Sequence, residues 1–202
     1  TTCHMTLIAT LEHLGLTMND VEIIDTAVAQ SYAAFKAGEA DIVCLWSPFG
    51  YQAEDDEGWV KVADAGHLGL KMPTLIVATE DAVKNRPEVV QEWLKCYLKS
   101  VEELRADPEG SAKLLYDFEE EEGISMTEEA AKRDIETRIF PSLEENKKAF
   151  AQDADGNSAA QEDLLKFADF MISQGKLTEA DKQAMIDDKA VDGTFMAKVA
   201  LD

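Results

Sequence analysis

The sequence predicts an α/β fold, in which alternating strands and helices are followed by a helical C-terminal half. Up to residue 80, short apolar runs typical of buried strands alternate with stretches of helical spacing that end near glycine. Beyond residue 80, apolar side chains recur only at helical spacing. Because strands that alternate with helices are typical of parallel sheets, we expect a parallel sheet in the first half.

The first half begins with a helix. Thr1, Thr2, Cys3 and His4 run directly into a helical pattern that closes at Gly15. Hydroxyl groups just ahead of a helix can cap its first free N–H groups, and these N–H groups and the helix dipole also favour an anion. The start of this helix is therefore the first candidate binding site.

Four apolar runs are predicted to form strands, and two helical stretches lie between them. A helix is expected over residues 27–37, with Gly38 at the position of a C-terminal cap. A short helical run is expected from Phe49 to Glu54. The predicted strands cover residues 21–25, 41–46, 59–63 and 73–79.

The second half is predicted to be helical. Pro87 occupies the favoured first position of a long helix, whose apolar side chains between Val89 and Leu104 share one face. Thr127 and the pair Asn157–Ser158 are expected to supply N-caps of later helices. These later helices are expected over residues 108–121, 127–138, 158–174 and 178–187.

The charge of the chain argues against two classes of partner. Its 202 residues include 41 Asp and Glu against 19 Lys and Arg, a formal net charge of −22. Because such a surface repels phosphate backbones and anionic lipid, we expect no nucleic-acid partner. No apolar stretch approaches the ~20 residues that span a bilayer, so direct membrane insertion is not expected either.

No metal or cofactor site is predicted. Cys3, Cys44 and Cys96 are odd in number and lack CxxC spacing, which supports neither a zinc site nor a disulfide framework. Cys44 and Cys96 are interpreted as small buried hydrophobes. The turn at residues 153–157 resembles a calcium loop only superficially, because its glycine stands at the fourth position rather than the sixth.

The order of the segments resembles a known family. A hydroxyl-rich helix start is followed by a Val-Glu-Ile strand, then by the segments Phe35–Asp41, Trp46–Phe49, Asp64, Asp81 and Asn85–Val90. In this order they resemble the periplasmic substrate-binding proteins of nitrate, aliphatic sulfonate, taurine and thiamine-precursor ABC importers. The resemblance covers residues 1–105 well and the helical tail more loosely.

The resemblance implies a partial periplasmic-binding-protein fold of type II, in which two α/β lobes hold a ligand in the cleft between them. Residues 1–65 would form an α/β segment of the second lobe, and residues 66–72 the crossover and hinge. Residues 73–202 would form the mostly helical C-terminal part of the first lobe. The N-terminal part of the first lobe precedes Thr1 in the family, so we expect this sequence to be a fragment without it.

The resemblance also implies ligand-binding residues. The turn Thr1–His4 would present hydroxyls and backbone N–H groups to an anionic or strongly polar ligand head. Trp46 would lie at the carboxyl edge of the sheet, where ligands bind, with Thr26 as a further neighbour. Family members often carry Asp where this chain has Ser47, which fits a ligand without a cationic group better than taurine. The alternatives left open are a capping turn without a ligand at Thr1–His4 and a core aromatic at Trp46.

We therefore expect an extracytoplasmic solute-binding component of an ABC importer, periplasmic or extracellular and associated with the cell envelope. Its partners would be a small anionic organic solute, most simply an aliphatic sulfonate, and ABC permease subunits. A lipid anchor ahead of Thr1 is left open. Two alternatives are the ligand-sensing domain of a signalling receptor and a relative that binds or makes the thiamine pyrimidine precursor. No enzyme is expected, because Cys3 and His4 are adjacent on a helix and do not face one another.

Overall fold

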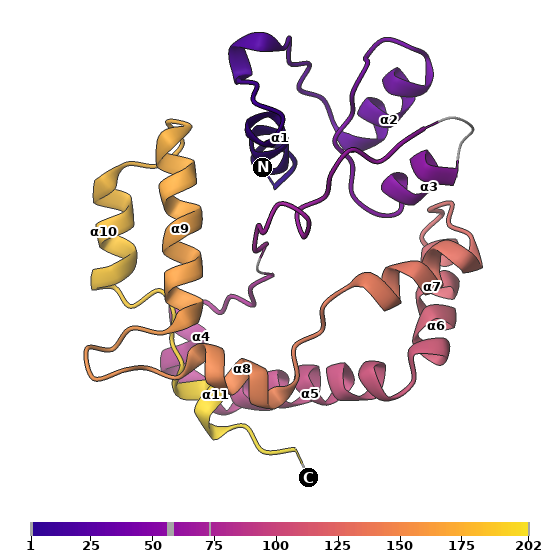
Figure 1. Cartoon of the computed structure of the whole chain (residues 1–202). Helices are drawn as coiled ribbons and strands as arrows, with labels where there is room; N and C mark the ends of the chain where they lie inside the picture. Colours follow the sequence, from indigo (N-terminus) through magenta and orange to yellow (C-terminus); the bar gives the residue numbers. More distant parts are fainter. Residues whose placement is uncertain (1, 56–58, 73, 202) are drawn as a thin grey trace. The chain divides into compact units, whose positions relative to one another are not determined.

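The computed structural model describes residues 2–55, 59–72 and 74–201, and within them the elements are helices, with no β-strand (Figure 1). The prediction of an α/β fold, a partial periplasmic-binding-protein fold of type II, is therefore wrong for the described residues. Thr1 and Pro73, the first residue of the fourth predicted strand, lie outside them.

The runs predicted as strands connect helices and lack the backbone pairing that defines a strand. Their large side chains stay exposed, with Ile24 at 62%, Val60 at 83% and Val77 at 87%. A run of β-branched residues favours a strand only where a neighbouring strand supplies hydrogen bonds and cross-strand packing. In the described part of the chain, none of the four runs has such a neighbour.

The chain divides into two compact units. Unit 1 comprises residues 1–72 and 108–138, and unit 2 comprises residues 73–107 and 139–202. The predicted division of the chain at residues 65 and 72 into lobe segments and a hinge stays a prediction.

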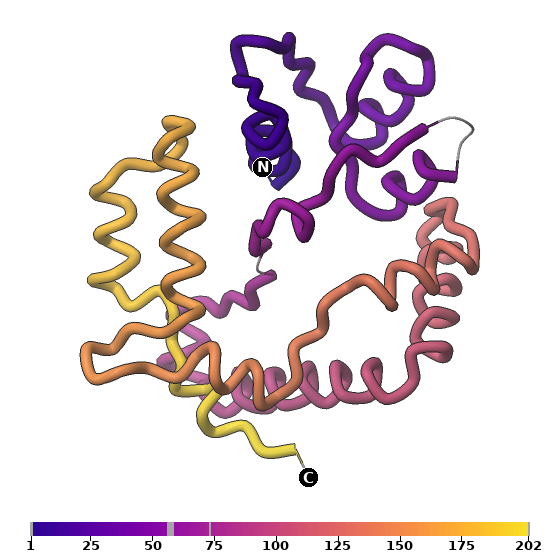
Figure 2. The backbone as a smooth tube through the Cα atoms, viewed as in Figure 1, coloured from indigo at the N-terminus to yellow at the C-terminus, as the bar shows by residue number. Residues whose placement is uncertain are grey.

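Two groups of packed side chains can be described in unit 1. Helices α6 and α7 lie side by side (Figure 2), and the buried Met126, Ala130 and Ala131 form a small core to which Tyr51 of α3 adds its ring. The aromatic rings of α2 pack on those of Phe49 and Trp59. The elements of this unit are α1 (Thr2–His13), the 3₁₀ helix η1 (Met18–Asp20), α2 (Val28–Lys36), α3 (Phe49–Asp55), α6 (Pro108–Glu121) and α7 (Glu128–Thr137).

Unit 2 is built around the long helix α5. Leu98 of α5 is buried together with Met196 and Val199, and Leu143 and Phe150 of α8 pack against this core. The elements of unit 2 are α4 (Glu80–Asn85), α5 (Pro87–Ala106), α8 (Leu143–Phe150), α9 (Ala159–Ser173), α10 (Glu179–Asp187) and α11 (Thr194–Lys198).

Several local predictions are confirmed. Helix α5 begins at Pro87. The hydroxyl of Thr127 accepts a hydrogen bond from the backbone N–H of Ala130 at 3.1 Å. The hydroxyl of Ser158 does the same for Gln161 at 3.2 Å. Helices α4, α8 and α11 were not predicted.

Candidate ligand-binding site in unit 1

The first turn of α1 contacts the segment that leads to Trp46 and Ser47. The thiol of Cys3 donates to the backbone carbonyl of Cys44 at 3.5 Å, and the thiol of Cys44 donates to the carbonyl of Cys3 at 3.3 Å. Cys44 stands only a few residues before Trp46 and Ser47. The structure thus brings the predicted site residues at the start of α1 into contact with the segment before Trp46 and Ser47. The contacting residues, Cys3 and Cys44, are 41 positions apart in the sequence.

The first turn of α1 has features that suit an anion. Thr2 is exposed, and Cys3 and His4 are half-buried. No acidic side chain lies in this turn, so no carboxylate of its own offsets the positive end of the helix. Thr1 lies outside the described residues, so its predicted role stays a prediction.

Ser47 is held by an arginine that the sequence did not single out. Nη2 of Arg138 donates to the hydroxyl of Ser47 at 3.3 Å and to Oδ2 of Asp134 at 2.6 Å. Arg138 directly follows α7 and keeps about half of its side chain exposed, whereas Asp134 is buried. A guanidinium has five N–H donors, so these two contacts leave further donors for an anionic group.

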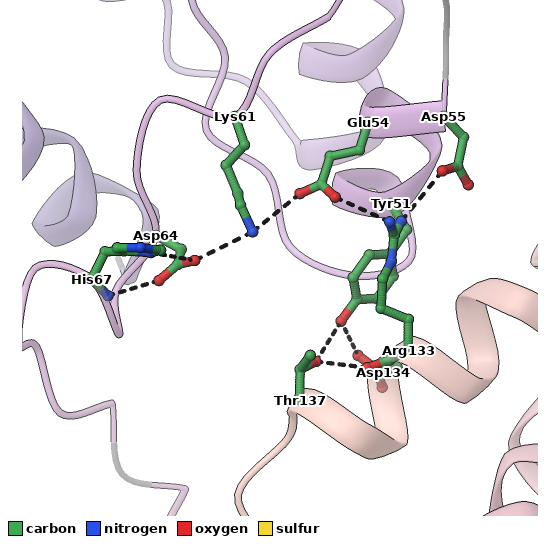
Figure 3. Close-up of polar contacts among 9 residues, drawn as sticks. All are labelled: Tyr51, Glu54, Asp55, Lys61, Asp64, His67, Arg133, Asp134 and Thr137. Carbon is green, nitrogen blue, oxygen red and sulfur yellow. Dashed lines mark hydrogen bonds and ion pairs between the residues drawn. The ribbon is translucent and has the colours of Figure 1, made fainter.

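Tyr51 completes the support of Asp134 (Figure 3). Its hydroxyl donates to Oδ1 of Asp134 at 3.2 Å and lies 3.0 Å from the hydroxyl of Thr137. Burial raises the pKa of the Tyr51 hydroxyl, against the opposing effect of the hydrogen bond with Thr137. The hydroxyl therefore stays protonated at neutral pH, and Asp134 receives a donor on each of its two oxygens.

Arg133 ties the end of α3 to α7. Its Nη1 lies 3.2 Å from Oε2 of Glu54 and its Nη2 lies 3.5 Å from Oδ1 of Asp55. Its guanidinium also lies over the ring of Tyr51, 4.4 Å from the centroid. These contacts hold Tyr51 in place from the other side, so that Arg133 supports the structure around Asp134.

Lys61 extends these ion pairs to a tight turn (Figure 3). Its Nζ lies 3.4 Å from Oε1 of Glu54 and 3.4 Å from Oδ2 of Asp64. Asp64 accepts hydrogen bonds from the backbone N–H of His67 at 2.8 Å and pairs with its ring at 3.2 Å. The hydrogen bonds from His67, helped by Lys61, lower the pKa of the Asp64 carboxyl to about 2. Asp64 is therefore ionised at neutral pH.

The other residues that the sequence singled out differ in exposure and in their contacts. Trp46 is 52% exposed and is not a buried core aromatic in this structure. The hydroxyl of Thr26 pairs with that of Ser31 at 2.7 Å, just ahead of and within α2. Cys44 is half-buried, but Cys96 is exposed, so the interpretation of Cys96 as a buried hydrophobe was wrong.

Arg138, Asp134 and Tyr51 are the residues of this site that sequence reasoning missed. Arg138 and Ser47 are 91 positions apart, and Tyr51 and Asp134 are 83 apart. No local spacing connects residues at such separations. The only sequence signal was the position of Arg138 at the predicted end of a helix, which says nothing about its partner.

A hollow of about 340 Å³ lies elsewhere in unit 1, between α6 and α7, and contains none of the predicted site residues. Its two lysines already pair with carboxylates, Lys113 with Asp117 at 2.9 Å and Lys132 with Glu136 at 4.0 Å. Three glutamates also line it, so it is not suited to an anion. Its lining residues are Glu109, Ala112, Lys113, Tyr116, Glu128, Glu129 and Lys132.

The described residues contain neither a group of metal ligands nor a membrane-spanning helix. Over residues 2–55, 59–72 and 74–201, no three His, Cys, Asp or Glu side chains gather as the ligands of a metal ion would. Among the helices that the structure describes, none combines the length and apolar character needed to cross a membrane.

Comparison with known proteins gives a family and two relatives. The model of the NMT1/THI5-like family matches residues 3–111. A Brachyspira hyodysenteriae protein, named provisionally as an ABC transporter periplasmic binding protein, is 28% identical over 198 residues, 98% of this chain and 54% of its own length. The taurine-binding periplasmic protein of Escherichia coli K12 is 27% identical over 109 residues, 54% of this chain and 34% of its own length.

The chain thus spans about half of the first relative and a third of the second. Both relatives are named as periplasmic binding proteins. No solved structure matched the chain significantly.

Proposed function

The chain belongs to the NMT1/THI5-like family, and we propose that it is an extracytoplasmic solute-binding component of an ABC importer. The family resemblance inferred from the order of the segments is confirmed by the match over residues 3–111. The chain is also related, at low identity, to ABC transporter periplasmic binding proteins. The observation that best supports the proposal is the contact between the first turn of α1 and the segment that leads to Trp46 and Ser47. This contact is made by the hydrogen bonds between Cys3 and Cys44.

The proposed ligand is a small anionic organic solute. The donors proposed for it are the hydroxyls of Thr2 and Ser47 and the guanidinium of Arg138, at the positive end of the α1 dipole. Charge-assisted hydrogen bonds of this kind contribute about 1.5–3 kcal/mol each. With a net charge of −22, the chain repels an anion at long range, so these local donors must supply the affinity.

An aliphatic sulfonate fits this set of donors best. Ser47 brings a hydroxyl, not a carboxylate, so this position offers no negative charge to an ammonium group. The named ligand of the Escherichia coli relative, taurine, carries such an ammonium. We therefore place an alkanesulfonate without an amine ahead of taurine, and ahead of nitrate and the thiamine pyrimidine precursor.

The proposal includes the partners, the location and the absence of covalent chemistry. Both relatives are named as periplasmic, so we place the protein in the periplasm or outside the cell, associated with the envelope. Ligand binding would favour a closed state that the ABC permease subunits recognise. The relatives are binding proteins by name, and we propose no enzymatic step for this chain.

Thermal unfolding in the presence of a panel of solutes tests this function. A ligand that binds the native state raises the melting temperature, so an alkanesulfonate should stabilise the protein more than taurine, nitrate or a pyrimidine does. Thr2→Val should remove most of that shift, because it deletes a donor at the helix start. Thr10→Val is the matched control, since Thr10 lies in the same helix about two turns farther along, where its hydroxyl donates to the carbonyl of Thr6 instead of facing the helix start.

The control variant should keep the full shift. The proposal fails if no solute in the panel raises the melting temperature. The assignment of the site to α1 fails if Thr2→Val binds the stabilising solute as tightly as the unchanged protein.

A further inference from the structure

Cys3 and Cys44 contact each other although they are far apart in the sequence. Each thiol reaches the other residue's backbone carbonyl, at 3.5 Å and 3.3 Å, and the two positions are 41 apart. We propose that these two cysteines form a reversible intramolecular disulfide by exchange with a disulfide of the glutathione type. The inference rests on the two thiols and does not depend on the ligand proposed above.

The reciprocal contact is what favours a disulfide. A disulfide requires two backbones close enough for the side chains to meet, with Cα atoms roughly 4.4–6.8 Å apart. When each sulfur touches the other residue's carbonyl oxygen, both side chains already extend toward the partner's backbone. Rotation about the Cα–Cβ bonds is then the main change needed to join the sulfur atoms.

The surroundings of the pair distinguish it from the third cysteine. Cys3 and Cys44 are half-buried within unit 1, and both are free thiols in this structure. Cys96 is exposed on α5 of unit 2, and its backbone carbonyl accepts a hydrogen bond from the hydroxyl of Ser100. Cys96 is therefore an exposed thiol outside the pair, and it is replaced by serine in the experiment below.

The two thiols have different roles in the exchange. The neighbouring Cys44 side chain lowers the pKa of the Cys3 thiol, against the effect of burial. The neighbouring Cys3 side chain and burial raise the pKa of the Cys44 thiol. Cys3 also lies in the first turn of α1, where the helix dipole favours a thiolate. Cys3 is therefore the attacking group and Cys44 the resolving group.

The reaction balances in two exchange steps. Cys3 loses its proton to solvent, and its thiolate attacks one sulfur of oxidised glutathione, forming a mixed disulfide and releasing one glutathione thiolate. Cys44 then loses its proton and attacks Sγ of Cys3, which forms the Cys3–Cys44 bond and releases the second glutathione. The two protein thiols are oxidised by two electrons, and one glutathione disulfide is reduced to two thiols.

The consequence is a covalent link between the α1 first turn and the segment before Trp46. In the reduced protein, this contact depends on weak thiol hydrogen bonds and packing alone. In the oxidised protein, the segment between the two cysteines becomes a closed loop, which restricts the unfolded chain. The oxidised form should therefore melt at a higher temperature than the reduced form.

Mass spectrometry after thiol trapping tests the proposal. The full chain carrying Cys96→Ser is equilibrated in buffers of oxidised and reduced glutathione, quenched with acid and alkylated with a maleimide. We expect a product that takes up no maleimide, carries no glutathione and has lost two hydrogens, with Cys3 and Cys44 joined in its peptide map. Adding Cys44→Ser should instead trap glutathione on Cys3.

A parallel equilibration in concentrated urea separates native geometry from chance pairing. If the fold places the thiols together, the equilibrium constant for the disulfide should be at least about tenfold larger in the native protein than in the unfolded one. The inference is overturned by glutathione on both cysteines, by two thiols that stay free, by a disulfide only between chains, or by equal constants in buffer and in urea.

Discussion

Asp134 is buried, at 5% exposure, and each of its two oxygens accepts a hydrogen bond, one from Tyr51 and one from Arg138. A carboxylate removed from water is costly unless its oxygens are hydrogen-bonded and its charge is paired. In return, the fixed carboxylate sets the orientation of the Arg138 guanidinium beside Ser47. Asp134 is thus a positioning residue for the proposed ligand donors, and lysine could not replace Arg138 in this two-sided contact.

At the residue scale, Asp64 predicts a pH dependence of stability. Its pKa of about 2 lies below the ordinary value of ~3.9 because His67 and Lys61 favour the charged form. A carboxyl with a lowered folded-state pKa stabilises the protein fully above about pH 4, and this contribution is lost as the pH falls through about 2. Asp64→Asn should lower the free energy of unfolding at pH 7 and have lost most of this effect at pH 2.

The expected loss at pH 7 is under about 1 kcal/mol, since the side chain is 42% exposed and solvent screens its pairs. Urea unfolding at pH 7, 4 and 2 measures it. Asp25→Asn is the control, because Asp25 is an exposed aspartate outside this turn. A loss for Asp64→Asn that is as large at pH 2 as at pH 7 would contradict the assignment.

The candidate site could be predicted only in its local parts. Thr2, Cys3 and His4 were predicted because a hydroxyl-rich helix start is a local signal, and their role stays a prediction. Ser47 and Trp46 came from the family resemblance. Arg138 could not be found, because its guanidinium is placed by a buried carboxylate on α7 and by a serine 91 positions away. Such contacts follow from how helices pack.

At the element scale, helix starts were predictable and strands were not. A cap is made within a few residues, as the hydroxyls of Thr127 and Ser158 show. Helix α8 was missed although Ser142 and Glu145 form a capping box, which the sequence pattern could have revealed. A strand depends on a second segment that no local pattern supplies. The four runs were predicted as strands from their apolar pattern along the chain, and in the described residues they lack a partner strand.

Gly193 gives a prediction about the packing of α8 and α11. A Cβ added at Gly193 would lie 2.4 Å from the backbone carbonyl oxygen of Phe150, a contact that no flexible side chain can relieve. Gly193→Ala should therefore push α11 from α8 and disturb the core around Met196. We expect a loss of about 1–3 kcal/mol in the free energy of unfolding, the range for overpacked cores.

Gly50→Ala is the matched control, because a Cβ there meets nothing within 4 Å and Gly50 lies in helix α3. Alanine in a helix is favoured over glycine by up to about 1 kcal/mol, so this variant should be neutral or more stable. Urea unfolding of both variants measures the difference. Equal stability of the two variants would show that α11 does not pack against Phe150 as described.

At the scale of the whole molecule, net charge and local donors act over different distances. The net charge of −22 opposes the approach of an anion. At physiological ionic strength, however, exposed charges more than about 8 Å away are largely screened. A ligand held by Thr2, Ser47 and Arg138 therefore depends mainly on the hydrogen bonds it makes.

The family could be recognised from the sequence while the fold class could not. The resemblance rested on the order of segments over residues 1–105, and the family model matches residues 3–111. The order of the segments can be read directly from the sequence. Sheet formation depends on which segments meet in space, and over the same residues the described structure contains helices and extended connections.

The proposed ligand of this protein is a small organic anion, held by charge-assisted hydrogen bonds in unit 1. Calorimetric titration with ethanesulfonate and with ethanesulfonamide tests it most directly, because the two are close in size and differ in charge. Loss of one charge-assisted bond costs about 1.5–3 kcal/mol, so the sulfonate should bind at least about tenfold more tightly. Ser47→Ala should weaken sulfonate binding and leave sulfonamide binding nearly unchanged. Equal or tighter binding of the uncharged sulfonamide would contradict the account.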